Sequence, residues 1–244
     1  MTTTATADPA LMDELKREIV TLANAQFDSR AYRRLLGLPL TKARAQAYVI
    51  QRTHWTNNRR DCWALAQGVA PLDIKRIIWD HEREELAGKP DGSVPDHYTL
   101  SIREAASLDL TPDDLINTPP CDGAATCMAA WLHLAKHSHW LTAVAASSAL
   151  ELSNSEAVLK DGSMSRRMGN KMSKELGIPM KKQAMNAEHM VADAEHGNLM
   201  TDVAQRYLHS RAELELILDG LRQSWSIDRV WKGQLADLME AIPD

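Results

Sequence analysis

The chain has 244 residues, of which 44% are hydrophobic and 25% are charged, and its formal net charge is −5. This composition is typical of a globular protein with a sizeable core. The acidic balance, with no basic run interleaved with aromatic residues, argues against nucleic acid as a partner. No apolar run approaches about 18 residues, so no membrane-spanning helix is expected. Three cysteines without C-x-x-C spacing argue against a disulfide framework and favour the cytoplasm.

Helical periodicity covers nearly the whole chain, and no stretch shows the alternation of a β-strand. We expect a flexible tail over residues 1–9 and a single domain over residues 10–244. The predicted fold is all-α, a single up-and-down helical bundle of about seven main helices. Predicted helices cover residues 9–27, 32–36, 41–69, 73–87 and 96–108, a short stretch from 111, and residues 124–152, 164–176, 179–208, 201–225 and 226–239.

The helix predicted from residue 179 to about residue 208 carries an unusual polar pattern. His189, Asp193 and His196 are at positions i, i+4 and i+7, so they share one helix face. Met185 and Val203 lie on the same stripe and are apolar, which places the polar trio toward the core. Buried without partners, these groups would cost several kcal/mol, whereas a metal ion would satisfy all three. The alternative is a surface His-Asp pair beside a hydrogen-bonded core histidine, and this pattern alone does not decide between them.

Further carboxylates and a histidine lie at two other helix ends. Glu151 ends the Ala-rich helix predicted over residues 124–152, on a stripe of small and apolar residues. A buried lone glutamate is rare unless it is paired or bound to a metal. Glu82, Glu84 and Glu85 precede a Gly/Pro-rich loop, and His97 follows it. That loop would allow two helix ends to converge on one ion, although a solvated acidic helix end explains the glutamates equally well.

Together these segments provide three imidazoles and three carboxylates. Two iron or manganese ions suit this set better than zinc, because carboxylate charge of about −3 offsets most of a +4 pair and carboxylates can bridge. Whether Glu82 or Glu84 takes the place of Glu85, and whether the pair is Fe/Fe or Mn/Fe, stays open. The six candidate metal ligands are Glu85, His97, Glu151, His189, Asp193 and His196.

The pattern resembles the heme-oxygenase-like diiron oxidases and oxygenases. That family includes an alkene-forming fatty-acid decarboxylase, the chlamydial protein associating with death domains, amino-acid-cleaving oxidases and N-oxygenases. Its members carry E-x-x-G followed by His, an inward Glu ending a long helix, and H-x-x-x-D-x-x-H. The resemblance covers about residues 48–208, with a longer loop than usual before the first His. The matching segments are Glu85-Leu-Ala-Gly88 with His97, Ala149-Leu-Glu151, and His189-Met-Val-Ala-Asp193-Ala-Glu-His196.

The resemblance implies a non-heme diiron oxidoreductase with two Fe²⁺ ions and O2 as co-substrate. The expected chemistry is N-oxygenation, oxidative C–C cleavage or desaturation of a small amino-acid-derived substrate through a peroxo-diferric intermediate. An external reductant could be a further partner. Haem is not implied, because the first predicted helix contains no histidine and the first histidine of the chain is His54.

Candidates for the substrate-binding wall are Arg52, Trp55 and Asn58 on one helix, with Tyr98 beside His97. Each could equally serve packing or the surface. The alternative function is a metal-independent thiaminase-like hydrolase, or a binding or interaction protein of the same fold. Cys127 lies too early in its helix to favour the hydrolase. The last amphipathic helix could pack internally or against a second copy in a homodimer.

Overall fold

The computed structural model describes residues 7–196 and 199–243, of which residues 191–196 are described as backbone alone. Within these ranges the chain forms twelve α-helices and one short 3₁₀ helix, and no β-strand. The predicted all-α class is therefore confirmed. No described helix combines the length and the apolar character that crossing a bilayer would need. The predicted tail and domain boundaries stay predictions, although the backbone N–H groups of Ala7 and Asp8 already donate to carbonyls near the end of α11.

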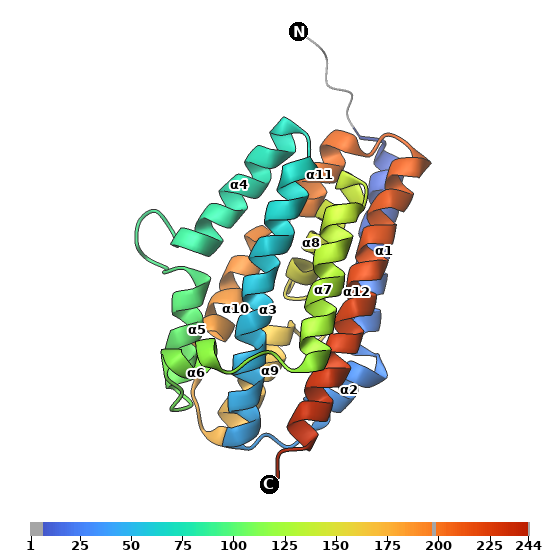
Figure 1. The fold of residues 1–244 in the computed structure, drawn as a ribbon. Coiled ribbons are helices and arrows are strands. Elements are labelled where there is room, and N and C mark those ends of the chain that lie inside the picture. The colour runs from blue at the N-terminus through green and yellow to red at the C-terminus, as the bar shows by residue number, and fades with distance from the viewer. Residues whose placement is uncertain (1–6, 197–198, 244) are drawn as a thin grey trace.

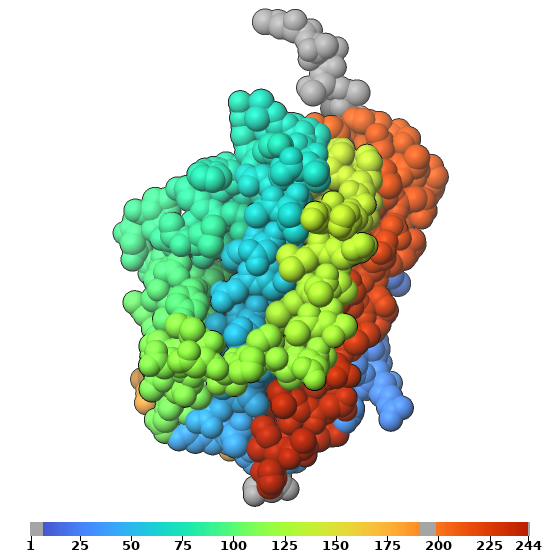
Figure 2. Space-filling view, in the orientation of Figure 1, coloured from blue at the N-terminus to red at the C-terminus, as the bar shows by residue number. Residues whose placement is uncertain are grey.

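The long helices run side by side along one common direction (Figure 1). The space-filling view shows α3, α7 and α12 packed against one another along one face of the molecule (Figure 2). The elements are α1 (Pro9–Phe27), α2 (Arg30–Gly37), α3 (Lys42–Val69), α4 (Leu72–Ala87), α5 (His97–Ala106), α6 (Pro112–Asn117), α7 (Asp122–His137), α8 (Trp140–Leu152), α9 (Met164–Leu176), the 3₁₀ helix η1 (Met180–Lys182), α10 (Ala184–His196), α11 (Leu199–Tyr207) and α12 (Arg211–Glu240).

Several helices begin at the side-chain caps that the sequence predicts. Thr41 begins α3, where its hydroxyl accepts from the backbone N–H of Arg44 at 3.3 Å. Thr111 and Asp114 form a reciprocal capping box at the start of α6. Each cap satisfies a backbone N–H that has no partner within its helix. The starts of these helices are therefore fixed by local sequence.

The prediction of a single helix over residues 124–152 is wrong, because the chain forms the two helices α7 and α8 there. Ser138 and His139 between them adopt extended backbone, with ψ of 167° and 142°. The Nδ1 atom of His139 accepts from the N–H of Leu141 at 3.3 Å and so caps α8. The apolar periodicity continues across this break, which hides it from pattern reading.

The boundaries predicted between residues 179 and 239 also need correction. Gln183 separates η1 from α10, and its amide donates to the carbonyl oxygens of Gly169 and Ile178. The predicted break near residue 225 is absent, because α12 is continuous from Arg211 to Glu240. This helix begins after Ser210, whose hydroxyl accepts a hydrogen bond from the backbone N–H of Glu213 at 3.3 Å. With the short helices and these additional breaks counted, the described residues form twelve α-helices.

Helix α8 lies at the centre of the bundle, as its Ala-rich sequence predicts. Every residue from Leu141 to Leu152 is buried. Helix α12 approaches it closely at Gly220, where a Cβ atom would collide with the carbonyl oxygen of Thr142. A glycine at this crossing therefore lets the two backbones meet. This packing fixes the position of Glu151, near the end of α8, in the interior.

Candidate metal centre

Glu85 and His97 meet where α4 ends and α5 begins. The Oε2 atom of Glu85 lies 2.5 Å from Nδ1 of His97, and both side chains are buried. The loop between them starts at Gly88, which has φ +76°, and a Cβ atom there would come within 2.8 Å of the Pro95 carbonyl carbon. Glycine is therefore needed for the turn that brings the two helix ends together.

Two arginines of α3 hold the carboxylate of Glu151. Nη2 of Arg59 lies 3.1 Å from Oε1 of Glu151, and Nη2 of Arg60 lies 3.8 Å from the same atom. The indole N–H of Trp63 donates to it at 3.4 Å. Burial alone would raise the pKa of Glu151, but the positive charge of Arg59 and the nearby His81 lower that pKa to about 2. Glu151 is therefore ionised at neutral pH.

Arg60 also joins the two buried glutamates of α4. Its Nη1 atom lies 2.9 Å from Oε1 of Glu82 and 2.7 Å from Oε2 of Glu85. Glu82 in turn lies 3.0 Å from Nδ1 of His81. Burial raises the pKa of Glu85, whereas Arg60 and His97 together hold it well below its usual range. Of Glu82, Glu84 and Glu85, only Glu85 is among the described residues that line the cavity beside His97.

Four of the six predicted ligands line one buried cavity. These are Glu85 from α4, His97 from α5, Glu151 from α8 and His189 from α10. The imidazole rings of His97 and His189 meet edge to face, with centroids 4.9 Å apart. Asp193 and His196, the other two predicted ligands, have side chains outside the described residues. The structure therefore brings together at least one residue from each predicted segment.

The donor chemistry of this cavity fits iron. Imidazole nitrogens and carboxylate oxygens are the ligands that non-haem iron takes, and buried carboxylates need a positive partner. Among the side chains that the structure describes, no three His, Cys, Asp or Glu residues form a group able to hold a metal ion. The side chains of Asp193 and His196 lie outside the described set. Arg59 and Arg60 compensate the charge of Glu151 and Glu85.

A family model described as "iron-containing redox enzyme" matches residues 46–229. The chain belongs to the iron-containing redox enzyme family. The resemblance drawn from the three motifs is thereby confirmed, because the match spans all of them. No curated protein matches the chain.

Solved structures show that the chain has a heme-oxygenase-like fold. It is similar to a domain of unknown function with that fold from Shewanella denitrificans OS217, with TM-score 0.72, 14% identity and coverage of 94% of this chain and 91% of that one. A CADD-like protein of unknown function from Nostoc punctiforme PCC 73102 has TM-score 0.70, 19% identity and coverage of 95% and 99%. A TenA homolog from Pseudomonas syringae pv. tomato DC3000 has TM-score 0.70, 13% identity and coverage of 96% and 94%.

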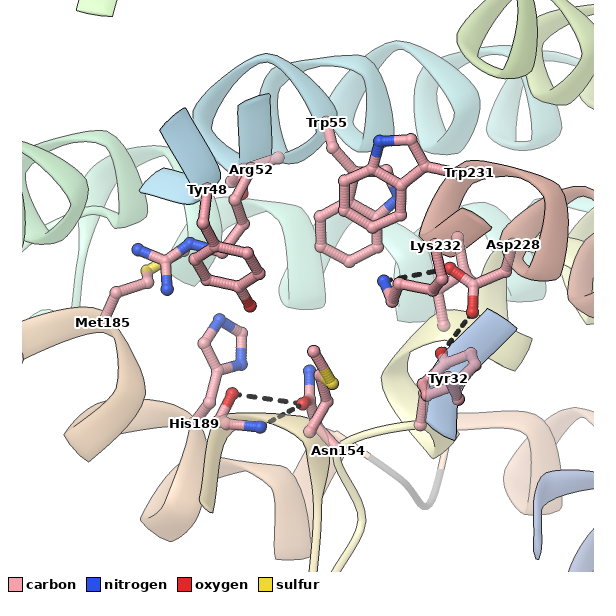
Figure 3. Close-up of a pocket in the computed structure, with 15 residues that line it drawn as sticks. Tyr32, Tyr48, Arg52, Trp55, Asn154, Met185, His189, Asp228, Trp231 and Lys232 are labelled. Atoms are coloured by element: carbon pink, nitrogen blue, oxygen red, sulfur yellow. Dashed lines mark hydrogen bonds and ion pairs between the residues drawn. The ribbon is translucent and has the colours of Figure 1, made fainter. Parts of the chain in front are cut away.

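The predicted substrate wall of this family member is only partly assembled. Arg52 and Trp55 line a second cavity (Figure 3). This cavity shares Trp55, Thr56, Asn154 and His189 with the first one. Asn58 faces α7 instead, where its amide donates to the carbonyl oxygen of Met128 at 3.4 Å. Tyr98 is half-buried and is not among the described residues that line either cavity.

Pattern reading missed the two arginines that hold the glutamates. Arg59 lies four residues after Trp55 and four before Trp63, so a cation sits within an aromatic stripe of α3. Its guanidinium carbon lies 5.8 Å and 6.0 Å from the ring centroids of these two tryptophans. A charged residue at that spacing is the signal that could have revealed a buried cation.

Proposed function

We propose that this chain is an O2-activating non-heme diiron oxidase or oxygenase that acts on a small amino-acid-derived substrate. One observation carries the proposal, namely two carboxylates and two imidazoles from four helices lining a single buried cavity. Membership of the iron-containing redox enzyme family supports the same chemistry. We also propose a reducing, cytoplasmic setting, because the sequence has an odd number of cysteines without C-x-x-C spacing.

The residues that would hold the two ions are Glu85, His97, Glu151 and His189, completed by Asp193 and His196. When bound, iron supplies the electrons for O2 reduction, which protein side chains do not provide.

The chain's own residues prepare the ligands for this role. Arg59 and Arg60 keep Glu151 and Glu85 ionised, so neither carboxylate needs to lose a proton before it binds a cation. The contact between Glu85 and His97 orients the imidazole. Because Glu85, His97 and Glu151 are buried, bulk water has little access to the place where O2 would react.

The similarity to a TenA homolog keeps a metal-independent function as the second candidate. A thiaminase-like hydrolase would need a reactive thiolate. Burial raises the pKa of the Cys127 thiol to about 11, and that of Cys62 to about 11 as well. None of the three cysteines lines either of the two described cavities. The structure therefore favours the redox function over a cysteine-dependent hydrolase.

The two functions are separated by mixing the ferrous chain with O2. We expect anaerobically iron-loaded protein to consume O2 and to show a transient visible absorbance in stopped flow, and His189→Ala to do neither. Cys127→Ser is the matched control and should behave as the wild type. If chelation of all metal leaves both the thermal stability and any activity unchanged, the metal-independent function is the correct one.

A further inference from the structure

The second cavity extends from His189 to a group of buried polar residues on α12. Its wall combines α3, α10 and α12 with residues of α2, α8 and α9. Figure 3 places His189 on one side of the cavity and Lys232, with Asp228 and Trp55, on the other. A ligand in this cavity would therefore have one end near the candidate metal centre and the other near Lys232.

Lys232 brings a buried positive charge to the far side. The residue is 5% exposed, and its Nζ atom lies 3.2 Å from Oδ1 of Asp228. The same ammonium lies 3.6 Å from the ring centroid of Trp231 and 5.5 Å from that of Trp55. An ammonium has three N–H donors, and Asp228 is its one hydrogen-bond partner among the described residues. Lys232 can therefore donate to a ligand without leaving Asp228.

Further buried polar atoms on the wall have no hydrogen-bond partner among the residues that the structure describes. They include the indole Nε1 atoms of Trp55 and Trp231 and the hydroxyl oxygen of Thr56. An indole N–H donates only, and a buried donor without an acceptor costs about 1–3 kcal/mol. Trp55 lies against α12, with its ring stacked on that of Trp231 at 5.2 Å. This wall therefore calls for an acceptor that the described part of the chain does not supply.

The one carboxylate and the one side-chain amide oxygen of the same wall are already engaged. Asp228 accepts from Lys232 and also from the hydroxyl of Tyr32. The side-chain oxygen of Asn154 accepts from the N–H and the hydroxyl of Ser165. A ligand that offers acceptors is therefore matched to this wall, whereas an ammonium group would compete with Lys232 for Asp228.

Apolar side chains make up much of the rest of the cavity. Leu150, Met164 and Met185 line it together with the stacked Trp55 and Trp231. Such surfaces favour an apolar ligand body between the two polar ends.

We propose that this cavity is a carboxylate subsite, in which Lys232 and Trp55 bind the carboxylate of a small ligand whose apolar body extends toward His189. The identification of that ligand as the substrate rests on the proposed function, whereas the binding of a carboxylate in this cavity does not. In this arrangement the carboxylate lies on the Lys232 side of the cavity, across from His189 (Figure 3). The reacting carbon or nitrogen atom is then at the opposite end of the molecule.

The test compares carboxylates with amides of the same shape. Binding of benzoate against benzamide, and of the smaller butyrate against butyramide, is measured by tryptophan fluorescence and calorimetry on the full chain, with and without anaerobic ferrous iron. We expect at least one carboxylate to bind roughly tenfold more tightly than its amide, in both metal states. Equal affinity of acid and amide in both pairs would overturn the proposal.

Variants locate the binding site. Lys232→Met should remove most of the preference for the carboxylate, whereas Lys136→Met, which changes an exposed lysine of α7, should keep it. Trp55→Phe retains an aromatic ring but loses the indole N–H, and should weaken carboxylate binding severalfold even if Lys232→Met does not fold. Full retention of the preference in Trp55→Phe and in folded Lys232→Met would refute the subsite. Carboxylate binding by a chain that refuses iron would overturn the proposed function alone.

Discussion

The imidazole of His97 lies 2.5 Å from the carboxylate of Glu85, although the two residues belong to different helices. Arg60 reaches the same carboxylate oxygen at 2.7 Å. Glu85 is therefore held from two sides, by an imidazole and by a guanidinium. The cavity depends on this arrangement, because both Glu85 and His97 line it.

Gly88→Ala should disturb this arrangement through the loop. Gly88 has φ +76°, and an added Cβ would clash with the backbone of residues 94–96. With ψ of 179°, this backbone conformation is essentially restricted to glycine, so it costs an alanine about 1–3 kcal/mol, and the clash adds to that cost. We expect a lower melting temperature and a weaker affinity for ferrous iron, measured by calorimetry and anaerobic titration.

Gly92→Ala is the matched control for the loop. Gly92 has a similar φ of +73°, but an added Cβ would have no neighbour within 4 Å. This variant should lose stability through backbone strain but retain iron affinity. Equal iron affinity in the two variants would show that the loop does not set the position of Glu85 and His97.

Arg60→Gln should lower the melting temperature of the iron-free chain and enlarge the rise in melting temperature on iron loading. The arginine is the shared positive partner of Glu82 and Glu85. Removing one partner of a buried ion pair costs about 3–5 kcal/mol, or roughly 6–20 °C in melting temperature for a chain of this size. Ferrous iron would restore the missing charge, so the rise in melting temperature on loading should exceed that of the wild type.

Arg83→Gln changes an exposed arginine of α4, the helix that carries Glu82 and Glu85, and is the control for Arg60. It should leave the iron-free melting temperature and its rise on loading close to those of the wild type. Identical behaviour of the two variants in scanning calorimetry would contradict the role given to Arg60.

Alkaline pH should destabilise the chain through its buried tyrosines. Burial and the adjacent Asp228 raise the pKa of Tyr32 well above its usual range, burial raises that of Tyr48, and burial with Asp73 raises that of Tyr207 to about 12. Above about pH 10 the unfolded chain loses phenolic protons that the folded chain keeps, so the free energy of unfolding falls as pH rises.

Phenolate absorbance measures this difference directly. At about pH 10.5 the native chain should show fewer ionised tyrosines, of the four in the sequence, than the chain in guanidinium. Tyr32→Phe should reduce the loss of stability between pH 10 and 11.5, since one of the shifted groups is gone. Superimposable native and denatured titration curves would contradict the buried environment of these hydroxyls.

Much of the fold follows from local sequence signals. Thr41 and Thr111 cap helices as predicted, because a cap needs only its own first turn. The break at Ser138 was not predictable in this way, since the apolar stripe continues through it while the backbone turns. The break after Tyr207 was also missed, although Ser210 and Glu213 form a recognisable cap.

The sequence predicts those residues of the candidate site whose polar side chains lie on an otherwise apolar helix face. A glutamate among small residues, such as Glu151, indicates a buried partner without any knowledge of the neighbouring helix. The identity of that partner depends on how α3 packs against α8, which brings Arg59 within 3.1 Å of Glu151. The spacing of residues in the sequence does not predict how α3 and α8 cross. It also does not predict that Lys232 of α12 lies beside Trp55 of α3.

The most direct measurement is an anaerobic titration of the chain with ferrous iron, with bound metal determined by elemental analysis. The account predicts about two iron ions per chain, and loss of at least one of them in His189→Ala at unchanged helical content. A chain that binds no iron under these conditions, or a His189→Ala variant that binds as much as the wild type, would contradict the diiron centre.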